Sequence, residues 1–402
     1  MMNDIALSET ISQLHDYCSD RDYKGHDVAD SVDCWLMTHT SIGKNNLIRF
    51  GFLQLTGHRL GYINMRPLMR IPTFHNGKGI ALFLNAYCNL YEVACTDEQT
   101  APLSKAVCLE KIDYLGHLLL TLRHKADKGA GWGYPTTWQA RNFQFPANTP
   151  TAVASSFAVD ALLHAYTLTK EEDFKNAALE TATFVLQDLH RTPYKEGFMF
   201  SYSQYSGNDT VYNASLLAAR ILLQCYQYEH NEEYLNLAQT AIETCVRDQA
   251  ADGSWKYGLL PVQTWIDNFH TGYNLEAIWE YKHITGSDRY DDCLKRGADF
   301  MLQHHFDANG VPKYYHNKQY PIDIHCCGSL FPMLYKLGLY EENATLARNV
   351  YDWTMDNMWS KRKHYFYFQH HKWFANKASL MRWSQAFMMN ALSYYEKSKL
   401  GV

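Results

Sequence analysis

The sequence predicts an all-α fold, an (α/α)6 toroid in which six helical hairpins close into a ring, and three observations support this prediction. Helical apolar patterns recur in pairs from Lys78 onward, each pair separated by a short break. Loops rich in glycine and aromatic residues return between the pairs. The last helical pattern is rich in Trp, Phe, Met and Leu, which favours a closed ring over the polar cap that an open array needs.

The loops supply the period of the repeat. Each begins with Gly or His and continues with Trp, Phe or Tyr in an extended pattern. Their first residues, Gly131, Gly197, Gly253, Gly310 and His364, are separated by 66, 56, 57 and 54 positions. A repeat of this length with two helices is typical of a helical-hairpin array.

The helices follow in chain order. The predicted pairs are 78–95 with 104–124, 150–168 with 171–189, 210–228 with 231–249, 269–284 with 287–305, and 323–337 with 340–358. A last helix, 380–398, has no partner after it. Residues 1–75 are less regular, with helical patterns near 28–39 and 43–56, and we expect this segment to close the ring. The sequence therefore predicts one domain over 1–402, with an open helical-repeat scaffold as the alternative.

Charge and composition narrow the class of ligand. The chain has 37 basic and 42 acidic residues, a net charge of −5, and no Lys/Arg cluster, so a nucleic-acid partner is not expected. Aromatic residues make up 14% of the chain, with 29 Tyr and 10 Trp. Many amphipathic rings suit a cleft for a flat, hydroxyl-rich ligand, so a saccharide is the expected partner.

The sequence shows no targeting signal, which predicts a cytoplasmic protein, and it shows no cofactor-binding motif. The start, Met1-Met2-Asn3-Asp4, has no signal-peptide pattern, and no run approaches the roughly 18 apolar residues that span a bilayer. The ten cysteines contain no CxxC pair, and reduced thiols are expected. There is no zinc-ligand spacing, GxGxxG, Walker loop or GxSxG, so neither a metal nor another cofactor is expected. The sequence leaves the oligomeric state open.

The stretch from Trp265 to Glu276 is the most informative single segment. Asp267 is well placed as an N-cap, because its carboxylate can accept from the free N–H groups of the first turn. If the helix starts there, Asp267, His270 and Asn274 share one face. An acid, an imidazole and an amide at a helix start can bind a polar ligand or move a proton, although a satisfied cap explains the same pattern.

Similar polar and aromatic groups recur near the predicted starts of the inner helices. In a toroid these starts crowd one mouth of the central cavity. Capping is the commonest reason for Asp at such places, and it applies to Asp209, Asp267 and Asp323. Capping does not call for His and Arg at matching positions, so we predict a ligand-binding or catalytic mouth. Its candidate residues are Trp138, Arg141, Tyr202, Tyr205, Asp209, Asn213, Trp265, Asp267, His270, Tyr273, Asn274, Asp323, His325, Arg382 and Trp383.

Several of these motifs resemble known families. Asp267-Asn268-Phe269-His270-Thr271, followed by Leu275, resembles the Asp-Tyr-His-Thr segment that opens a helix in glucuronyl C5-epimerases. The chain also resembles, more distantly, the toroids of uronate lyases and unsaturated glucuronyl hydrolases. Over most of its length it is similar to a bacterial family found with genes for cell-surface polysaccharide biosynthesis. The motifs that carry this second resemblance are Asn64-x-Arg66-Pro67, Gly131–Pro135, Ile266–Gly272 and Ile322–His325.

These observations predict an enzyme that modifies or cleaves a glycan or glycan precursor, with uronic acid as the expected component. Proton abstraction beside a carboxylate would lead to epimerisation or β-elimination. Arg141 or Arg382 would neutralise the sugar carboxylate. His270 would act as base and acid with Asp267 orienting it, or a tyrosine would take that role.

Two other functions stay open at this point. One is a glycoside hydrolase whose acid/base pair is Asp267 with Asp209 or Asp323. The other is a non-catalytic protein that binds glycans or assists polysaccharide assembly. The tyrosines that compete with His270 for the proton-transfer role are Tyr202, Tyr205 and Tyr273.

Overall fold

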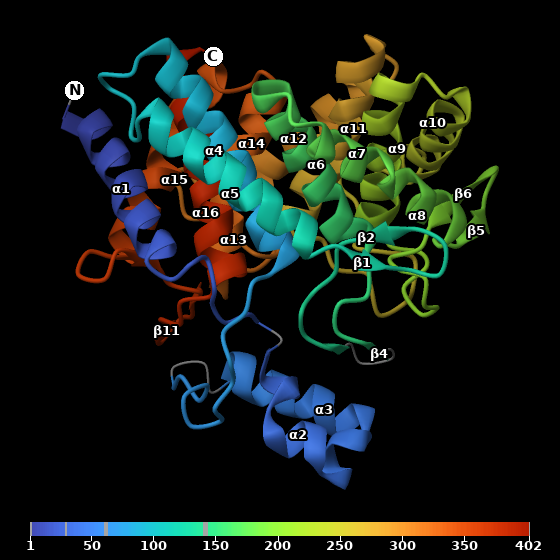
Figure 1. Ribbon diagram of the computed structural model, residues 1–402, viewed down its shortest axis with the longest axis horizontal. Helices are drawn as coiled ribbons and strands as arrows, with labels where there is room; N and C mark the ends of the chain where they lie inside the picture. The colour runs from blue at the N-terminus through green and yellow to red at the C-terminus, as the bar shows by residue number, and fades with distance from the viewer. Residues whose placement is uncertain (1, 29, 60–62, 140–143, 402) are drawn as a thin grey trace.

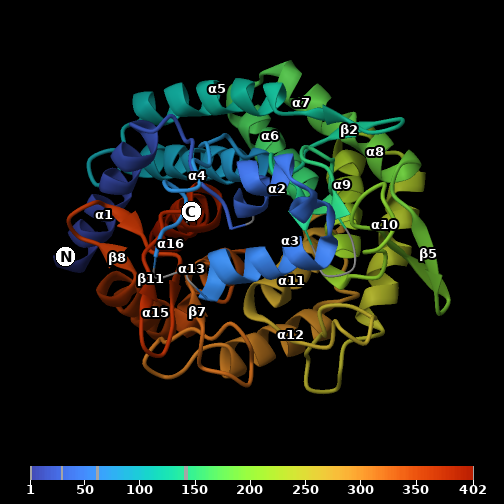
Figure 2. The same ribbon diagram turned by 90° about the horizontal axis from the view of Figure 1, so that it is seen from below.

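The computed structural model describes residues 2–28, 30–59, 63–139 and 144–401, and it shows a closed ring of helices (Figures 1 and 2). Six inner helical segments contact one another in sequence order, and the last, α16, contacts the first, α4. The inner segments are α4 (Gly77–Thr96), α6 (Ala152–Thr169), α9 (Tyr212–Glu229), α11 (Asn268–Thr285), α13 with α14 (Ile324–Gly328, Leu330–Lys336), and η5 with α16 (Met381–Ala386, Phe387–Leu400). The predicted all-α (α/α)6 toroid is confirmed.

The outer wall is a second layer around this ring (Figure 2). Its members are α5 (Lys105–Thr121), α7 with α8 (Glu172–Leu179, Thr181–Gln187), α10 (Glu232–Val246), α12 (Asp291–His304), α15 (Ala344–Asn357) and α1 (Met2–Ser19). α1 packs against α16 and so lies outside the inner helix that the sequence left without a partner. α1 was not predicted from the sequence, although its buried residues Leu7, Ile11, Leu14 and Cys18 follow a helical period.

The fifth inner helix is broken where one helix was expected. The predicted span 323–337 is divided at Ser329 into α13 and α14. Pro332 lies in the first turn of α14, where its missing N–H costs least. The break therefore follows from Pro332. Proline has no backbone N–H, so an unbroken helix through this position would lack one backbone hydrogen bond.

Short antiparallel strand pairs lie among the loops, and three of the pairs include part of an aromatic loop. The pairs are β1 with β2 (His124–Lys125, Ala130–Gly131), β3 with β4 (Trp138–Gln139, Gln144–Phe145), β5 with β6 (Arg191–Tyr194, Gly197–Phe200), and β8 with β9 (Trp359–Ser360, Tyr365–Phe366). A three-stranded sheet has the order β11 (Ala375–Asn376), β10 (Gln369–His370) and β7 (Ile322–Asp323). The pairing Gln369↔Asp323 fixes the start of α13 against the loop of the next repeat.

Backbone hydrogen bonds join several of the aromatic loops to the start of the preceding inner helix. The first N–H of α6, Ala152, donates to the carbonyl of Tyr202 at 2.9 Å. Asn268 of α11 donates in the same way to Tyr314 at 2.9 Å, and Ile324 of α13 donates to Phe368 at 3.1 Å. These bonds satisfy free N–H groups at the helix starts and hold the aromatic loops over one mouth of the ring.

The N-terminal segment 30–59 lies across that mouth. It comprises η1 (Asp30–Asp33), α2 (Trp35–His39), η2 (Ser41–Lys44), α3 (Asn46–Leu53) and η3 (Gln54–Arg59). Figure 1 shows α2 and α3 below the ring, and Figure 2 shows them in front of its centre. Among the helices described, none is long and apolar enough to cross a membrane.

Candidate active site

A cavity of about 440 Å³ lies at this mouth, between the ring and the N-terminal segment 30–59. Trp138 and Trp383 line it together with Asp323. Tyr314 and Tyr315 add aromatic surface from the loop before α13, and Val28, Leu53 and Gln54 add the N-terminal side. The cavity therefore combines flat aromatic rings with one buried carboxylate.

Asp267 and His270 form a hydrogen-bonded pair at the start of α11. The Asp267 carboxylate accepts from the backbone N–H of His270 at 3.0 Å, so it caps the helix as expected, and it contacts the Nδ1 atom of that ring at 2.8 Å. It also accepts from the indole N–H of Trp265 at 2.9 Å. Burial alone would raise the pKa of Asp267, but the charge and hydrogen bonds of His270 outweigh it and hold that pKa below its usual value. Asp267 is therefore an ionised carboxylate that orients the imidazole.

The second imidazole, His325, lies in the first turn of α13. Its Nε2 atom is 2.5 Å from the hydroxyl of Tyr273, and that hydroxyl is 3.4 Å from Nζ of Lys78. The three residues come from α13, α11 and α4, so the chain of contacts crosses the ring. Burial, and then the positive charges of Lys78 and Arg382, lower the pKa of His325 well below its usual value. His325 is therefore a neutral imidazole, which can accept a hydrogen bond from the Tyr273 hydroxyl.

Phe269 connects the two histidines. Its ring centroid is 4.4 Å from that of His270 and 4.3 Å from that of His325, on which it stacks. Trp383 meets His325 edge-on at 4.7 Å. The two imidazoles thus border one aromatic enclosure. The Nδ1 atom of His325 is buried without a hydrogen-bond partner among the described residues.

Asp323 is the buried acid of the cavity. It accepts from the indole N–H of Trp383 at 2.8 Å, from the side chain of Gln369 at 2.7 Å, and from the backbone N–H of His325 at 2.9 Å as an N-cap. Burial raises the pKa of Asp323 to about 6, against the lowering effect of these donors. Asp323 and Asp267 therefore differ in protonation over the mildly acidic range.

Lys78 is a buried cation without a carboxylate partner among the described residues. Its Nζ atom lies 4.2 Å from the ring centroid of Phe157, 4.8 Å from that of Tyr273 and 4.9 Å from that of Phe387. Aromatic faces compensate part of the lost hydration of an ammonium group. Burial, and then the charge of Arg382, still lower the pKa of Lys78 well below its usual value.

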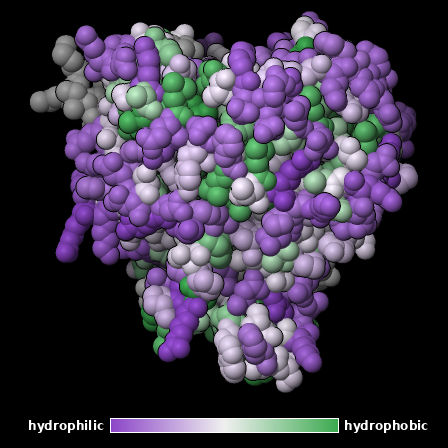
Figure 3. Space-filling view, viewed as in Figure 1, coloured by the Kyte–Doolittle hydropathy of each residue, from purple (hydrophilic) through white to green (hydrophobic). Residues whose placement is uncertain are grey.

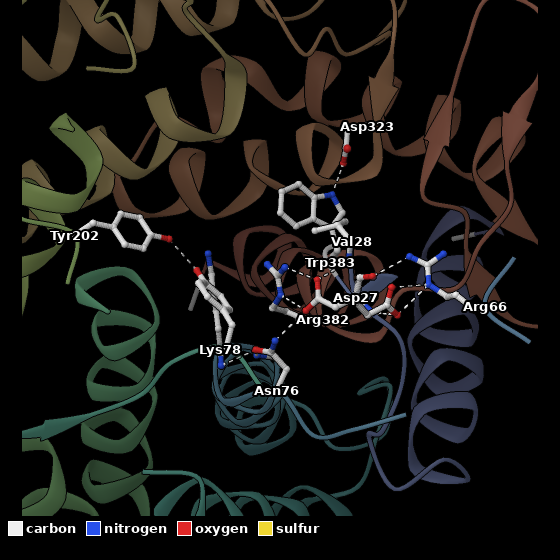
Figure 4. Close-up of polar contacts among 12 residues, drawn as sticks. Asp27, Val28, Arg66, Asn76, Lys78, Tyr202, Asp323, Arg382 and Trp383 are labelled. Atoms are coloured by element: carbon white, nitrogen blue, oxygen red, sulfur yellow. Dashed lines mark hydrogen bonds and ion pairs between the residues drawn. The ribbon is translucent and has the colours of Figure 1, made fainter. Parts of the chain in front are cut away.

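Arg382 already has a carboxylate partner. Its Nε atom donates to Asp27 at 2.6 Å, and a second guanidinium N–H donates to the other oxygen of the same carboxylate. Asn76 donates to Asp27 at 2.9 Å, and Arg66 donates to the Asp27 carbonyl at 2.8 Å (Figure 4). The predicted carboxylate-binding arginine therefore holds the N-terminal segment in this structure.

Several other predicted residues join the same aromatic network. Trp138 stacks on Tyr134 and Tyr202, with centroid separations of 5.1 and 6.3 Å. The hydroxyls of Tyr134 and Tyr202 are 3.2 Å apart, and the Arg382 guanidinium lies 5.1 Å from the Tyr134 ring. Burial raises the pKa of Tyr202 well above its usual value, so its hydroxyl stays protonated.

The remaining predicted residues lie elsewhere or lack such contacts. Tyr205 is 44% exposed, and Asp209 contacts His190 at 3.6 Å. Asp209 does not cap its helix as expected, because Val211 occupies the cap position and Asp209 accepts instead from Gly207. Asn213 and Asn274 are buried in inner helices, each with a side-chain oxygen that lacks a partner among the described residues. Arg141 lies outside the described residues.

Sequence reasoning missed two central residues. Lys78 is the second residue of α4, next to its N-cap Asn76, so the equivalent position in the repeat could have suggested it. Asp27 belongs to the irregular N-terminal part, where no period indicates a partner for Arg382. Among the described residues, no three His, Cys, Asp or Glu side chains are placed to hold a metal ion.

The ring has a second cavity, of about 710 Å³, at the opposite ends of the inner helices. Most of its charged groups are paired. Arg220 donates to Glu280 at 2.8 Å and to Asp160 at 2.5 Å, while Lys336 contacts Glu276 at 2.8 Å and Lys397 contacts Glu92 at 2.7 Å.

Comparison with known proteins identifies the fold but not the family. No protein-family model and no curated protein matches the sequence. Among solved structures, the chain is similar to cellobiose 2-epimerase from Bacillus thermoamylovorans (TM-score 0.60, 12% identity, 82% of this chain and 90% of that one). It is also similar to a family 76 α-mannanase from Bacteroides thetaiotaomicron (0.58, 13%, 81% and 87%) and to an unsaturated glucuronyl hydrolase specific for heparin (0.57, 11%, 80% and 86%). The expected resemblance to toroids of this kind is confirmed for the fold.

Proposed function

We propose that this protein is an enzyme that modifies a saccharide by moving a proton at a carbon next to a carbonyl or carboxylate group. The observation that carries the proposal is the pair of imidazoles, His270 and His325, which contact the same Phe269 ring. Each has its own partner, Asp267 or Tyr273. Two proton-transfer groups in one aromatic enclosure suit a reaction that removes a proton and returns it. The fold similarity to sugar epimerases supports a saccharide substrate.

In this proposal His270 is the base. The C–H bond breaks, the proton moves to Nε2 of His270, and the electron pair moves onto the adjacent carbonyl or carboxylate oxygen. Asp267 stabilises the imidazolium that forms. Return of a proton to the other face of the carbon, from Tyr273 with His325 behind it, yields the epimer. In the alternative outcome, the electron pair forms a C=C bond while the substituent on the next carbon leaves with its bonding pair and takes the proton of Tyr273. The products are an unsaturated sugar and an alcohol.

A more specific form of the proposal is that the substrate contains a uronic acid. Its carboxylate would need a cation at the cavity, and Arg382 would have to exchange Asp27 for the substrate. Arg141 is the other cation predicted for this role. The wider proposal, proton transfer on a saccharide, does not depend on this exchange.

Incubation in D2O, followed by NMR and by near-ultraviolet absorbance, tests the proposal for both possible products. The full chain would be incubated with neutral reducing disaccharides and with uronic-acid oligosaccharides. Deuterium at carbon together with a new stereoisomer indicates epimerisation. Near-ultraviolet absorbance without deuterium at that carbon indicates elimination, because the carbon that loses its proton becomes part of a double bond. Asp267→Asn keeps a capping side chain but removes the charge. It is expected to lose exchange with an unchanged melting temperature, whereas lost stability with retained exchange contradicts the role of Asp267.

One observation favours a hydrolase as a second candidate. Asp323, with a pKa raised to about 6, suits a general acid, and the ionised Asp267 suits its carboxylate partner. Release of reducing ends with neither deuterium at carbon nor near-ultraviolet absorbance would support this function, and activity should then fall as pH rises through about 6. Saccharide binding with neither exchange nor cleavage would indicate the non-catalytic alternative.

A further inference from the structure

The N-terminal arm, residues 34–75, has an unusual surface. Sixteen large hydrophobic side chains are exposed among the described residues, and eight of them lie in this arm. They are Trp35, Leu36, Ile42, Leu47, Ile48, Leu55, Ile63 and Leu68. Such a concentration of exposed apolar side chains marks an interaction surface. Figure 3 shows the arm as a projection at the lower edge, where green and pale surface lies between purple side chains.

Helix α3 presents large apolar side chains outward. Leu47, Ile48 and Gly51 share one face of the helix, and Leu47 is 67% exposed. A side chain at Gly51 would meet nothing within 4 Å. The opposite face carries Arg49 and Leu53, which are buried against the ring. In a helix that serves only its own fold, the apolar face is turned inward and the cation outward.

The inward arginine is held in place by specific contacts. Arg49 donates to Gln139 at 3.1 Å and lies 3.6 Å from Asp33. The backbone N–H of Thr137 donates to Asp33 at 2.8 Å. These bonds tie the arm to the loop that carries Trp138, so the outward orientation of Leu47 and Ile48 is set by the fold.

The charge of the arm identifies the kind of partner. Residues 34–75 contain five basic residues and no Asp or Glu, in a chain whose net charge is −5. Arg49 and Arg66 are buried beside Asp33 and Asp30, whereas Lys44 and Arg70 are exposed. Exposed apolar side chains with cations beside them match the boundary between lipid tails and anionic headgroups. The helices α2 and α3 have five and eight residues, too short to cross a bilayer.

We propose that the N-terminal arm docks this protein onto the surface of an anionic lipid bilayer. Trp35, Leu47 and Ile48 enter the headgroup boundary, and Lys44 and Arg70 meet the lipid phosphates. The arm also lines the 440 Å³ cavity through Leu53 and Gln54, so docking turns that mouth of the ring toward the membrane. The proposal is independent of the reaction, because docking is measured without a substrate.

Vesicle flotation of the full chain tests this directly. The wild-type protein is expected to float with vesicles of phosphatidylcholine and phosphatidylglycerol, and much less with phosphatidylcholine alone. Leu47→Ser with Ile48→Ser should weaken binding at least about tenfold, because interfacial binding scales with the apolar area buried. Lys44→Gln with Arg70→Gln should weaken binding to the anionic vesicles roughly tenfold or more, and added salt should act in the same direction.

Leu109→Ser is the matched control, because Leu109 is 38% exposed on the outer helix α5, away from the arm. It should float as the wild type does. All substituted side chains are exposed, and circular dichroism would check that each variant is folded. Absence of wild-type binding to anionic vesicles would overturn the proposal. So would a dimer, seen by light scattering, that the Leu47/Ile48 variant dissociates while vesicle binding is unchanged, since the arm would then contact a second copy of the chain.

Discussion

The two ends of the ring differ in what surrounds their buried cationic side chains. At the end with short turns, Arg220 lies between Asp160 and Glu280, and every contact is within 2.8 Å. At the mouth with long loops, Lys78 is equally buried but faces the rings of Phe157 and Tyr273. A buried charge without a counter-ion costs free energy, whereas a paired one is compensated. The comparison indicates that ion pairs stabilise the short-turn end, whereas burial of Lys78 at the mouth carries a free-energy cost that no ion pair among the described residues offsets.

The largest expected effect concerns catalysis at the mouth. His270→Ala should lower the rate of proton transfer by about 10²–10⁴-fold, as expected for loss of a positioned acid/base group. The melting temperature should change little, because the ring of His270 is partly exposed. His270→Gln keeps a similar volume and should be about as inactive. His117→Ala, on the outer helix α5, is the control, and near-normal exchange in His270→Ala would transfer the role to the tyrosines.

The next effect concerns stability at the opposite end. Arg220→Met leaves the buried carboxylate of Glu280 and the mostly buried one of Asp160 without their common partner, which should lower the free energy of unfolding by about 3–5 kcal/mol. Chemical denaturation would measure it, with Arg296→Met as the control for a surface pair, expected to lose less than about 1 kcal/mol. Saccharide chemistry should survive while the variant is folded. A loss of activity at full stability would place the site at this end of the ring.

The same network predicts a pH dependence. Burial would raise the pKa of Asp160, but Arg220 and Lys336 outweigh it and lower that pKa to about 2. The unfolded carboxyl titrates near 3.8, so this contribution to stability is present above that pH and is lost as pH falls toward 2. Arg220→Met should remove most of this contribution, and unfolding free energies measured at neutral and acidic pH would show it.

A smaller effect of opposite sign is expected at the mouth. Lys78→Met replaces an unpaired buried amine with an apolar chain of similar size, and should stabilise the protein by about 1–3 kcal/mol at neutral pH. Proton transfer should nevertheless weaken, because Tyr273 loses a neighbour. Lys256→Met, at an exposed position, is the control and should change stability little. A destabilised Lys78→Met would contradict the comparison between the two ends.

Lys78 also has a predictable dependence on pH. Its pKa is lower in the folded than in the unfolded protein, so the unfolded chain binds more protons from that lowered pKa up to 10.5. The wild type should therefore gain stability as pH rises through this window. The gain should be absent in Lys78→Met, and denaturation at neutral and alkaline pH would measure the difference.

The sequence predicts the ring better than it predicts the site. The spacing of loops and apolar patterns identified the repeat because each hairpin must bury the same faces. α1 was missed because it is separated from the repeats and pairs with the far end of the chain, so no local period relates it to α16. Asp27 was missed for the same reason: its partner Arg382 is 355 positions away. Contacts of this length leave no pattern in a single sequence.

The candidate residues show the same difference between local contacts, which the sequence predicts, and long-range contacts, which it does not. Asp267 and His270 are three positions apart on one helix, so helical geometry alone predicts their contact, and the structure has it at 2.8 Å. The hydrogen bond between Tyr273 and His325 joins two repeats. Both residues were predicted as candidates from the sequence, but the bond between them was not. Tyr205 and Asp209 were selected because they lie near a predicted helix start. That criterion is weaker, because a loop can carry a residue near a helix and still point it toward solvent.

The smallest expected effect tests this last distinction. Tyr205 is 44% exposed, and none of its hydrogen bonds among the described residues joins it to either imidazole. Tyr205→Phe should therefore change the rate of proton transfer by no more than about twofold, because its hydroxyl makes no contact that the reaction needs. Tyr273→Phe is the matched comparison, since it removes the hydroxyl 2.5 Å from His325 and should cost at least about tenfold. Solvent-exchange rates of the two variants would be compared on one substrate. A large loss in Tyr205→Phe with a small one in Tyr273→Phe would mean that the reacting carbon lies at the rim of the mouth rather than among the inner helices.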